Sequence, residues 1–461
     1  MSAVQSWGWK GNQIPPGAFS TKMSTTSETS ARPHGAAQQA CQFLVVGAGP
    51  AGLTAVATLL DHGVSHIVWV DPTFSAGRIG HKYRDIPRSF LVLPLSSLSL
   101  SHPHTHTQTT LSLLISRKTL TPCRSRCLYS NTKIGLFLQY VAASPTLSKL
   151  VNENPERENA YTALGRLDLD QGNLLGYAAD LMLMLTDRMV VTHCDTIKTF
   201  HARVTALDGC CTDDGAGWTA SIEMTNPEQA AVTRTLVKAE KVILATGSEP
   251  VEPADRGGTI ELEVALSGRR LGAALAEMGL SGGAEKIGVV GSSHSAFLVL
   301  RNLATLADGP RVNMVHAFRT GELRFAEQKD GWVLFDNTGL KGLVADWVRE
   351  EYWPLVEQRR VVRVHVTDPT SLKEALQDCV RVIYAIGYRA SATPNITLDG
   401  HQQRLLFDHH SGCFQGLKGL FGCGIAFPNR SVDHLGNVEL AVGILKFSKF
   451  LNSAVPAWIQ A

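Results

Sequence analysis

The feature that most restricts the fold of this chain is the segment 43–52, which reads FLVVGAGPAG. A short apolar run, a glycine turn and the start of an apolar stretch follow one another, the order expected of a strand, a turn and a helix. In such a turn Gly47 allows the tight bend, Gly49 lets the backbone approach a pyrophosphate, and Gly52 lets the helix pack on the strand. The helix N-terminus then faces the phosphate charge. The cofactor-binding residues predicted here are Gly47, Gly49, Pro50, Ala51 and Gly52.

The residues after this turn complete a dinucleotide-binding pattern. A helix is predicted over Leu53–Asp61, and a second apolar strand, His66–Val70, ends at Asp71. Asp71 follows Gly47 by 24 residues, the position from which a carboxylate accepts the ribose hydroxyls of a dinucleotide. A glycine turn alone is weak evidence. Strand, helix, second strand and terminal acid in this order predict a binding unit rather than a chance glycine loop.

Halfway along the chain the same pattern returns with serines in place of two glycines. Residues 286–296 read KIGVVGSSHSA, again a strand, a turn and a helix that runs to about Leu306. Serine is small enough for close packing, and its hydroxyl can bond a phosphate. The predicted cofactor-binding residues of this second turn are Gly291, Ser292, Ser293 and Ser295.

The strand after this second turn, residues 311–315, lacks a terminal acid. His316, Arg319 and Arg324 follow it instead. A carboxylate at this place would repel a ribose 2′-phosphate, whereas an arginine would bind it with charge-assisted hydrogen bonds. The sequence therefore favours NADPH over NADH, with Arg319 as the predicted contact. The alternative is that both arginines lie in a solvated surface loop.

The composition is that of an ordinary enzyme, and it excludes several other classes. The 461 residues should form two or more domains, and neither the net charge of +2 nor any charge run suggests a nucleic-acid partner. Nine cysteines without a CxxC pair argue against a zinc site and a dithiol redox centre. Residues 1–40 are polar and predict a disordered leader rather than a signal peptide. No apolar run is long enough to span a bilayer, so we expect a cytoplasmic protein; the sequence leaves the oligomeric state open.

The order of these motifs resembles that of flavoproteins with two dinucleotide-binding domains, the second inserted in the first. Flavin-containing monooxygenases, N-hydroxylating lysine and ornithine monooxygenases and pyridine-nucleotide disulfide reductases belong to this group. Segment 47–52 is similar to their FAD pyrophosphate turn, and segment 291–296 is similar to their NADPH turn. Ala245, Thr246 and Gly247 resemble the ATG crossover at which the chain leaves the FAD domain.

Two later segments and one strand residue extend the resemblance. Tyr384–Tyr388 is similar to the L-A-T-G-Y segment of the monooxygenases, with Ile386 in place of threonine. Residues 421–424 resemble the last FAD motif, which normally ends in Gly-Asp, but Gly424 occupies the place of the acid. The resemblance implies FAD contacts for Gly422, Gly424 and Ile425, and it places Val204 near the adenine.

The resemblance also implies a fold and a domain organisation. The expected fold class is α/β: an FAD-binding Rossmann-like domain with an inserted NADPH-binding Rossmann-like domain, each with three layers around a parallel central sheet. The FAD domain is predicted over 41–252 and 381–461, and the NADPH domain over 253–380. Helices are expected over Gly135–Leu150, Gly172–Met189 and Asn437–Leu451. Met182, Met184 and Leu185 in the second of these helices suggest an apolar pocket or plain core.

Motifs that this chain lacks narrow the choice among these groups of flavoproteins. Disulfide reductases need a cysteine pair beside the flavin, and no suitably spaced pair exists. The F-x-G-x-x-x-H signature of Baeyer–Villiger and flavin-containing monooxygenases is not found before the second turn, where Leu271–Ala276 lies. A monooxygenase nearer the N-hydroxylating type remains, or an NADPH-dependent flavin oxidoreductase that inserts no oxygen. A third possibility is an inactive or non-enzymatic nucleotide-binding protein.

The first of these readings implies FAD, NADPH, O2 and a small substrate, by family habit one of specialised metabolism. The enzyme would oxygenate that substrate through a flavin–oxygen adduct, which asks little acid–base chemistry of the protein. Asn131 and Lys133 lie where related enzymes line the flavin, so they are the predicted catalytic residues. A helix cap is the alternative for Asn131. His434 and Asn437, before the last predicted helix, allow the same two interpretations.

Segment 88–129 differs from its surroundings and interrupts what reads as one loop. It is rich in Ser, Thr, Leu, His and Pro, with runs such as SSLSLS and HPHTHT that resemble translated dinucleotide repeats. We interpret it as a translated intron or a recent noncoding insertion, expected as an unpacked loop beside the flavin pocket. The alternative is a metal site made by His102, His104 and His106, with Cys123 and Cys127 nearby. A repeat tract lacks the fixed geometry of such a site, so no metal is predicted.

Overall fold

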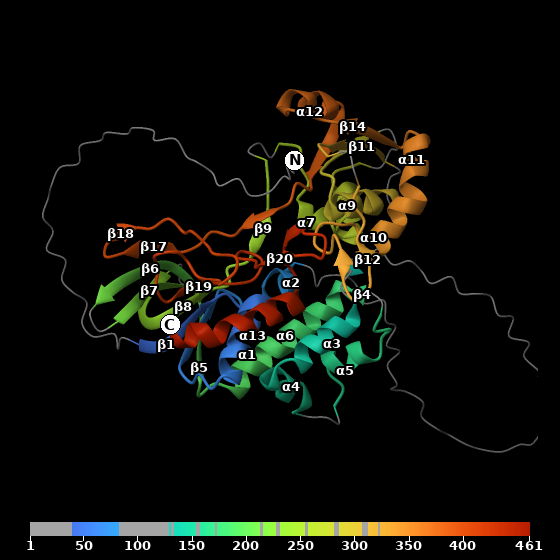
Figure 1. Ribbon diagram of the computed structural model, residues 1–461. Helices are drawn as coiled ribbons and strands as arrows, with labels where there is room; N and C mark the ends of the chain where they lie inside the picture. Colours follow the sequence, from blue (N-terminus) through green and yellow to red (C-terminus); the bar gives the residue numbers. More distant parts are fainter. Residues whose placement is uncertain are drawn as a thin grey trace, which may run out of the picture.

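The computed structural model shows two α/β units, each built on its own sheet (Figure 1). It describes residues 39–82, 129–130, 133–153, 157–170, 173–212, 215–226, 231–253, 257–280, 285–306, 312–320 and 323–461. The predicted leader, 1–40, therefore lies outside the described residues except for residues 39 and 40. The anomalous segment, 88–129, lies outside them except for residue 129.

The first sheet contains a parallel part that carries the first glycine turn. Strand β1 lies between β2 and β8, and β5 and β19 extend the parallel part on either side. In the parallel part of these strands the apolar residues are almost all buried, as expected for strands covered on both faces, whereas Val232 and Leu236 in the first half of β8 are exposed. The bounds are β1 Gln39–Val46, β2 Ile67–Asp71, β5 Ile197–His201, β8 Ala231–Leu244 and β19 Leu420–Gly422.

The first sheet is mixed rather than wholly parallel, which differs from the prediction. Strand β8 is 14 residues long, so its first half pairs antiparallel with β7 while its second half pairs parallel with β1. The antiparallel strands are thereby continuous with the parallel part of the sheet. The remaining strands are β6 Arg203–Thr212, β7 Gly215–Asn226, β17 Asn395–Leu398 and β18 His401–Gln402.

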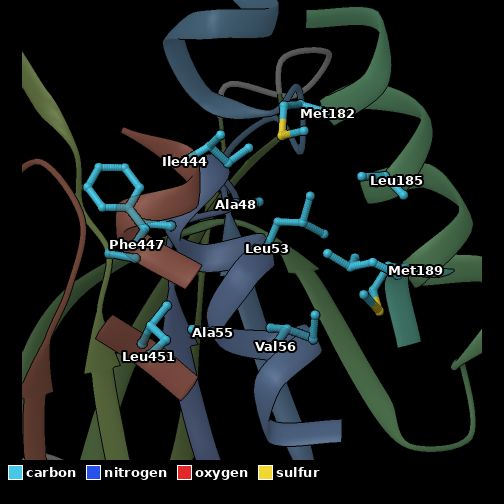
Figure 2. Close-up of a cluster of buried hydrophobic side chains, with 14 of the residues drawn as sticks. Ala48, Leu53, Ala55, Val56, Met182, Leu185, Met189, Ile444, Phe447 and Leu451 are labelled. Atoms are coloured by element: carbon cyan, nitrogen blue, oxygen red, sulfur yellow. The ribbon is translucent and has the colours of Figure 1, made fainter. Parts of the chain in front are cut away.

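Helices cover one face of this sheet and form the largest core. Helix α1, Pro50–Asp61, is buried on nearly all sides because it lies between the sheet and helices α6 and α13. Figure 2 shows Leu53 and Val56 on the side of α1 that faces α6, and Leu451 of α13 beside Ala55 on the other side. Met182 and Leu185 are fully buried in the same cluster, so they belong to the core. The helices are α3 Ile134–Ala142, α4 Pro145–Asn152, α5 Ala160–Gly165, α6 Leu175–Thr192 and α13 Ile444–Gln460. The opposite face is covered by loop residues such as Phe414 and Phe427 rather than by helices.

The helix predicted over Gly172–Met189 is shifted by three residues to Leu175–Thr192, and the other two predicted helices differ more. The helix predicted over Gly135–Leu150 is two helices, because Ser144 adopts an extended conformation and caps α4 by accepting a hydrogen bond from Leu147 N (3.2 Å). Pro145 occupies the first helical position. Proline has no backbone N–H, but an N–H at this position would have no partner within the helix. The last helix begins at Ile444 rather than Asn437, because residues 430–440 form a hairpin instead.

The second unit is a parallel sheet of four strands in the order β14-β11-β10-β15. Helix α12 packs on one face and α8, α9 and α10 pack on the other, so the three predicted layers are confirmed here. The strands are β10 Lys286–Val290, β11 Asn313–Phe318, β14 Val361–His365 and β15 Cys379–Tyr384. The helices are α7 Leu262–Ala265, α8 Gly268–Glu277, α9 His294–Ala304, α10 Gly342–Trp347, a π-helix Val348–Tyr352, α11 Trp353–Glu357 and α12 Pro369–Leu376.

Two short antiparallel strands join the units. The chain leaves the first unit through β9, Ser248–Pro250, and returns through β16, Tyr388–Ala390, which pairs with it. The boundary expected at 380/381 falls inside β15, which pairs with β10 and so belongs to the second sheet.

The remaining short elements lie between or beside the two units. They are α2 Gly77–His81, β3 Tyr129–Ser130, β4 Asn173–Leu174, β12 Glu327–Gln328, β13 Val333–Leu334, β20 Arg430–Val432 and β21 Val438–Leu440. No helix of the described part of the chain is both long enough and apolar enough to cross a membrane.

Candidate functional site

The first glycine turn has no room for side chains. Gly47 has a φ of +108°, and a Cβ there would lie 2.4 Å from Ala245 O. A Cβ on Gly52 would lie 1.9 Å from Gly47 O. Both contacts are with backbone atoms, so neither can be relieved by a side-chain movement. The predicted crossover, Ala245 to Gly247, therefore lies directly against the predicted pyrophosphate turn.

The N-terminus of α1 is free of side-chain caps. Gly49 is the N-cap residue without a capping side chain, and Pro50 occupies the first turn. The first amides of this helix thus remain available to an anion. Gly424 has a φ of +80°, and a Cβ there would lie 2.4 Å from Ala51 Cβ. The last motif therefore packs on α1 at a position where a side chain would meet Ala51.

Hydrogen bonds of the Asp71 carboxylate connect the first glycine turn with the loop that follows β2. One carboxylate oxygen accepts a hydrogen bond from Ala48 N (2.8 Å), and the other accepts from Thr73 N and Phe74 N (2.8 Å each). The acid predicted to bind ribose is thus placed at the turn but already holds three backbone amides. Val204, predicted near the adenine, has its side chain buried in the core on the other face of the sheet, so only its backbone can meet a nucleotide.

The second turn repeats this construction. Gly291 has a φ of +139°, and a Cβ there would lie 2.3 Å from Ala385 O. Ser293 is the N-cap residue of α9 but makes no side-chain cap. The hydroxyls of Ser292 and Thr320 are 2.7 Å apart, which joins the turn to the end of β11. Ser295 lies in the first turn of the same helix.

The strand registers show that the two units are equivalent residue by residue. Val45 pairs with Trp69 in the first unit, and Val289 pairs with His316 in the second. Gly47 N donates to Val70 O (2.8 Å), and Gly291 N donates to Ala317 O (2.9 Å). Counting two residues on from Trp69 and from His316 places Phe318 where the first unit has Asp71. The second unit thus has an aromatic ring in place of the acid that was predicted to bind ribose.

The structure places differently the two arginines for which a surface loop was the alternative to nucleotide binding. Arg319 directly follows Phe318 at the end of β11, next to Thr320 and therefore beside the second turn. The Arg324 guanidinium lies over the Phe335 ring, 5.2 Å from its centroid. Arg324 is thus committed to a ring elsewhere, whereas Arg319 is exposed beside the predicted nucleotide site.

In the described part of the chain, the predicted catalytic residues do not come together in one site. Asn131 lies outside the described residues. Lys133 is the exposed N-cap residue of α3, with its Nζ 3.4 Å from Asp170 Oδ1 and no side-chain cap. Asn437 donates to Asp433 within the β20–β21 hairpin, and His434 packs against Trp332 with ring centroids 5.1 Å apart. Neither of the latter two caps α13, so the capping interpretation is wrong for both.

His434 and Asn437 instead line a cavity of about 510 Å³ between the second unit and the C-terminal part of the first. The wall from the second unit is Trp332 to Asn337, and the opposite wall includes Arg430 and Lys446. None of the predicted cofactor-binding residues lines it. No sequence pattern could have found this cavity, because its walls come from segments far apart in the chain.

One known protein decides the family. Monooxygenase AgnR1 of Paecilomyces divaricatus is 34% identical over 445 residues, which cover 92% of this chain and 100% of that protein. The chain belongs to this monooxygenase family. The sequence-based prediction of a monooxygenase, and hence of an oxidoreductase, is thereby confirmed. No protein-family model matches the sequence.

Solved structures agree with the fold. The FAD-bound cadaverine monooxygenase DfoA of Erwinia amylovora has a TM-score of 0.55 at 13% identity, over 92% of this chain and 95% of that one. The ornithine N-hydroxylase KtzI of Kutzneria sp. 744, whose structure contains reduced FAD, NADP+ and L-ornithine, has a TM-score of 0.52 at 12% identity, over 91% and 99% of the two chains. The predicted resemblance to N-hydroxylating monooxygenases is confirmed at the level of the fold.

The cysteines whose side chains the structure describes form no disulfide with one another. They are Cys41, Cys194, Cys210, Cys379, Cys413 and Cys423. Burial raises the pKa of Cys41 and of Cys423 to about 12, so both stay protonated. No group of three His, Cys, Asp or Glu side chains is suited to a metal within the described ranges. The histidine tract at 102–106 lies outside those ranges.

A buried carboxylate joins the two units of the monooxygenase. The Glu263 side chain, at the start of the second unit, is only 8% exposed and accepts a hydrogen bond from Arg78 Nη1 (2.8 Å). Lys82 Nζ is 3.6 Å from the other Glu263 oxygen. Arg78 Nε also donates to Ser248 O (2.8 Å), where the chain leaves the first unit. Helix α2 is therefore held to both the crossover and the second unit.

We expect Glu263→Gln to lower the free energy of unfolding by about 1–3 kcal/mol, because the amide leaves the half-buried Arg78 charge without its partner. Thermal unfolding with flavin content recorded in parallel measures this. Glu249→Gln is the matched control: Glu249 pairs with Arg389 at the same crossover, but their side chains are 40% and 62% exposed. That change should cost at most about 0.5 kcal/mol. Equal losses of unfolding free energy in the two variants would contradict the inference that the buried Glu263 pair stabilises the contact between the units more than an exposed pair does.

Proposed function

We propose that this monooxygenase binds FAD in its first unit and NADPH in its second, and that it oxygenates a small organic metabolite with O2. The observation that carries this proposal is the pair of equivalent turns. In each of them a glycine of positive φ lies against a backbone carbonyl, and an uncapped helix begins at once. Such turns suit a pyrophosphate, because the backbone comes close and the first helical amides are free.

The residues present fit both groups. In the first turn Gly47 and Gly49 keep the backbone bare, and the Gly424 segment packs on Ala51. In the second turn Ser292 and Ser293 offer hydroxyls beside the amides of α9. When bound, the flavin supplies the acceptance of hydride and the activation of oxygen. The chain binds and orients the two groups, and its helical core excludes water from the first unit.

A preference for NADPH over NADH follows from the end of β11. Phe318 brings no charge to the place of the ribose acid, and Arg319 is exposed beside it. A guanidinium recognises a 2′-phosphate through charge-assisted hydrogen bonds. Arg319 is therefore the proposed determinant of coenzyme choice.

We expect Arg319→Ala to lower kcat/KM for NADPH about 10- to 100-fold, because one or two charge-assisted hydrogen bonds are lost. The value for NADH should stay within about twofold, since NADH has no phosphate to lose. Steady-state oxidation of each coenzyme measures this. Arg324→Ala is the control, because that side chain lies over Phe335 instead. A parallel fall with both coenzymes in Arg319→Ala would contradict phosphate recognition.

The visible spectrum of the purified protein, followed by anaerobic NADPH addition, tests the proposed function. Flavin bands that bleach with NADPH support both cofactor sites. Readmission of oxygen then separates a monooxygenase, in which substrate couples NADPH use to product, from a reductase that inserts no oxygen. A colourless protein that does not take up added FAD would overturn the proposal. Removal of residues 88–129 followed by the same measurement shows whether that segment blocks the site.

A further inference from the structure

We infer that His316 is a positioning residue that holds the second phosphate turn in its binding conformation, together with Tyr352. His316 Nε2 lies 2.7 Å from Gly291 O, and His316 Nδ1 lies 2.5 Å from Tyr352 Oη. The inference rests on the proposed binding of NADPH to the second unit. It adds an interaction that neither the glycine pattern nor the helix terminus provides.

The hydrogen-bond partners fix the state of the ring. Gly291 O can only accept, so Nε2 must carry the proton, and Nδ1 of the neutral ring then accepts from the Tyr352 hydroxyl. Burial and, to a lesser degree, the nearby Arg363 guanidinium lower the pKa of His316 to about 4, although the hydrogen bond to Gly291 O acts in the opposite direction, so the ring stays neutral near pH 7. One tautomer is therefore fixed, with its N–H directed at the turn.

The surroundings keep the ring in place. His316 is fully buried, and its ring contacts those of Phe297, Phe318 and Tyr352 at centroid distances of 5.2, 5.5 and 5.8 Å. Tyr352 ends the π-helix between α10 and α11. Such π turns are frequent at functional sites. Here the last residue of the π turn is the one that bonds His316.

In the first unit a different residue makes the equivalent hydrogen bond to the carbonyl of the turn glycine. Trp69 stands at the position equivalent to His316, and its Nε1 donates to Gly47 O (2.9 Å). In both units a side chain from the second strand thus holds the carbonyl of the turn glycine. This carbonyl is one end of the peptide whose N–H belongs to the next residue, so fixing it fixes the direction of that N–H. In the first unit this amide is Ala48 N, which donates to Asp71 Oδ2 (2.8 Å). In the second unit Phe318 occupies the place of Asp71 and offers no acceptor, so the Ser292 amide is directed by the held carbonyl alone and can meet a phosphate.

The test uses the flavin-loaded protein and NADP+ as the probe, with binding measured by calorimetry. His316→Phe keeps a ring but removes both hydrogen bonds, and we expect it to weaken NADP+ binding about tenfold while flavin content stays unchanged. The KM for NADPH should rise by a similar factor, and the limiting rate of anaerobic flavin reduction should stay within about twofold. His316→Gln retains an N–H donor and should restore part of the affinity.

Two further variants separate positioning from loosened packing. Phe297→Leu disturbs the same aromatic cluster without touching either hydrogen bond, so it should lower the unfolding temperature but leave NADP+ affinity unchanged. Trp69→Phe should weaken flavin retention and leave NADP+ binding unchanged. Loss of NADP+ affinity in Phe297→Leu equal to that in His316→Phe would overturn the inference, and so would unchanged affinity in His316→Phe. A wild-type protein that does not bind NADP+ at all would overturn the proposed coenzyme, and this inference with it.

Discussion

Gly47→Ala is expected to yield a protein purified without flavin. The substitution asks a non-glycine residue to adopt a φ of +108° and places its Cβ 2.4 Å from Ala245 O. That carbonyl cannot move freely, because the neighbouring Ala245 N donates to Val46 O (2.9 Å). Strain and backbone displacement together should cost about 3 kcal/mol or more, which corresponds to a loss of FAD affinity of at least about 100-fold. The ratio of flavin to protein absorbance after gel filtration measures it.

Gly63→Ala is the matched control for this variant. Gly63 also has a positive φ, +78°, and lies just after α1, but a Cβ there would meet nothing within 4 Å. It therefore reports the cost of the backbone conformation alone, about 1 kcal/mol, and should keep its flavin. Full flavin content in Gly47→Ala would show that FAD is not held by this turn. Flavin loss in both variants would point to general destabilisation instead.

Gly291→Ala is expected to give the opposite phenotype, a yellow protein that NADPH does not bleach. Its Cβ would lie 2.3 Å from Ala385 O and 3.3 Å from Ala296 Cβ, at a φ of +139°. These contacts belong to the second unit, so the first unit should fold and retain its flavin. The KM for NADPH should rise by about 100-fold or more, because the turn that receives the pyrophosphate is displaced. Anaerobic stopped-flow reduction measures it.

Gly279→Ala controls this second variant. Gly279 follows α8 in the same unit with a φ of +69°, and a Cβ there would meet nothing within 4 Å. Reduction by NADPH should be unchanged in it. Dithionite should still reduce the flavin of Gly291→Ala, which separates a lost coenzyme site from a damaged flavin. A bleached flavin with normal NADPH dependence in Gly291→Ala would contradict the assignment of the second turn.

The parts of the fold that could be predicted are those with a local cause. The turns at Gly47 and Gly291 follow from short-range patterns of glycine, serine and apolar residues, and both have the geometry that the patterns predict. The crossover at Ala245 was predicted from a resemblance. The Ala245 carbonyl occupies the space that a Cβ on Gly47 would need, so this contact gives a steric reason for the glycine at 47. A Cβ on Gly424 would likewise meet Ala51.

The predictions that differ from the structure concern contacts across the chain. One helix was expected where Ser144 and Pro145 end one helix and start another, and the cap that decides this is a single hydrogen bond. His434 and Asn437 were placed before a helix, but the hairpin around them is held by pairing between Arg430–Val432 and Val438–Leu440. Pairing partners of this kind cannot be read from periodicity, because the period of a short strand is ambiguous.

The sequence by itself determined the two nucleotide-binding units, their order and the absence of an acid after the second one. These follow from residue size and backbone freedom, which act within a few positions of the chain. Only the tertiary structure decided which side chain supports each turn, because Trp69 and His316 reach their glycines through strand register rather than through sequence distance. It also decided that Arg319, and not Arg324, lies beside the second turn, and that Glu263 joins the units. Each of these depends on where separate segments meet, and that is fixed by packing of the whole chain.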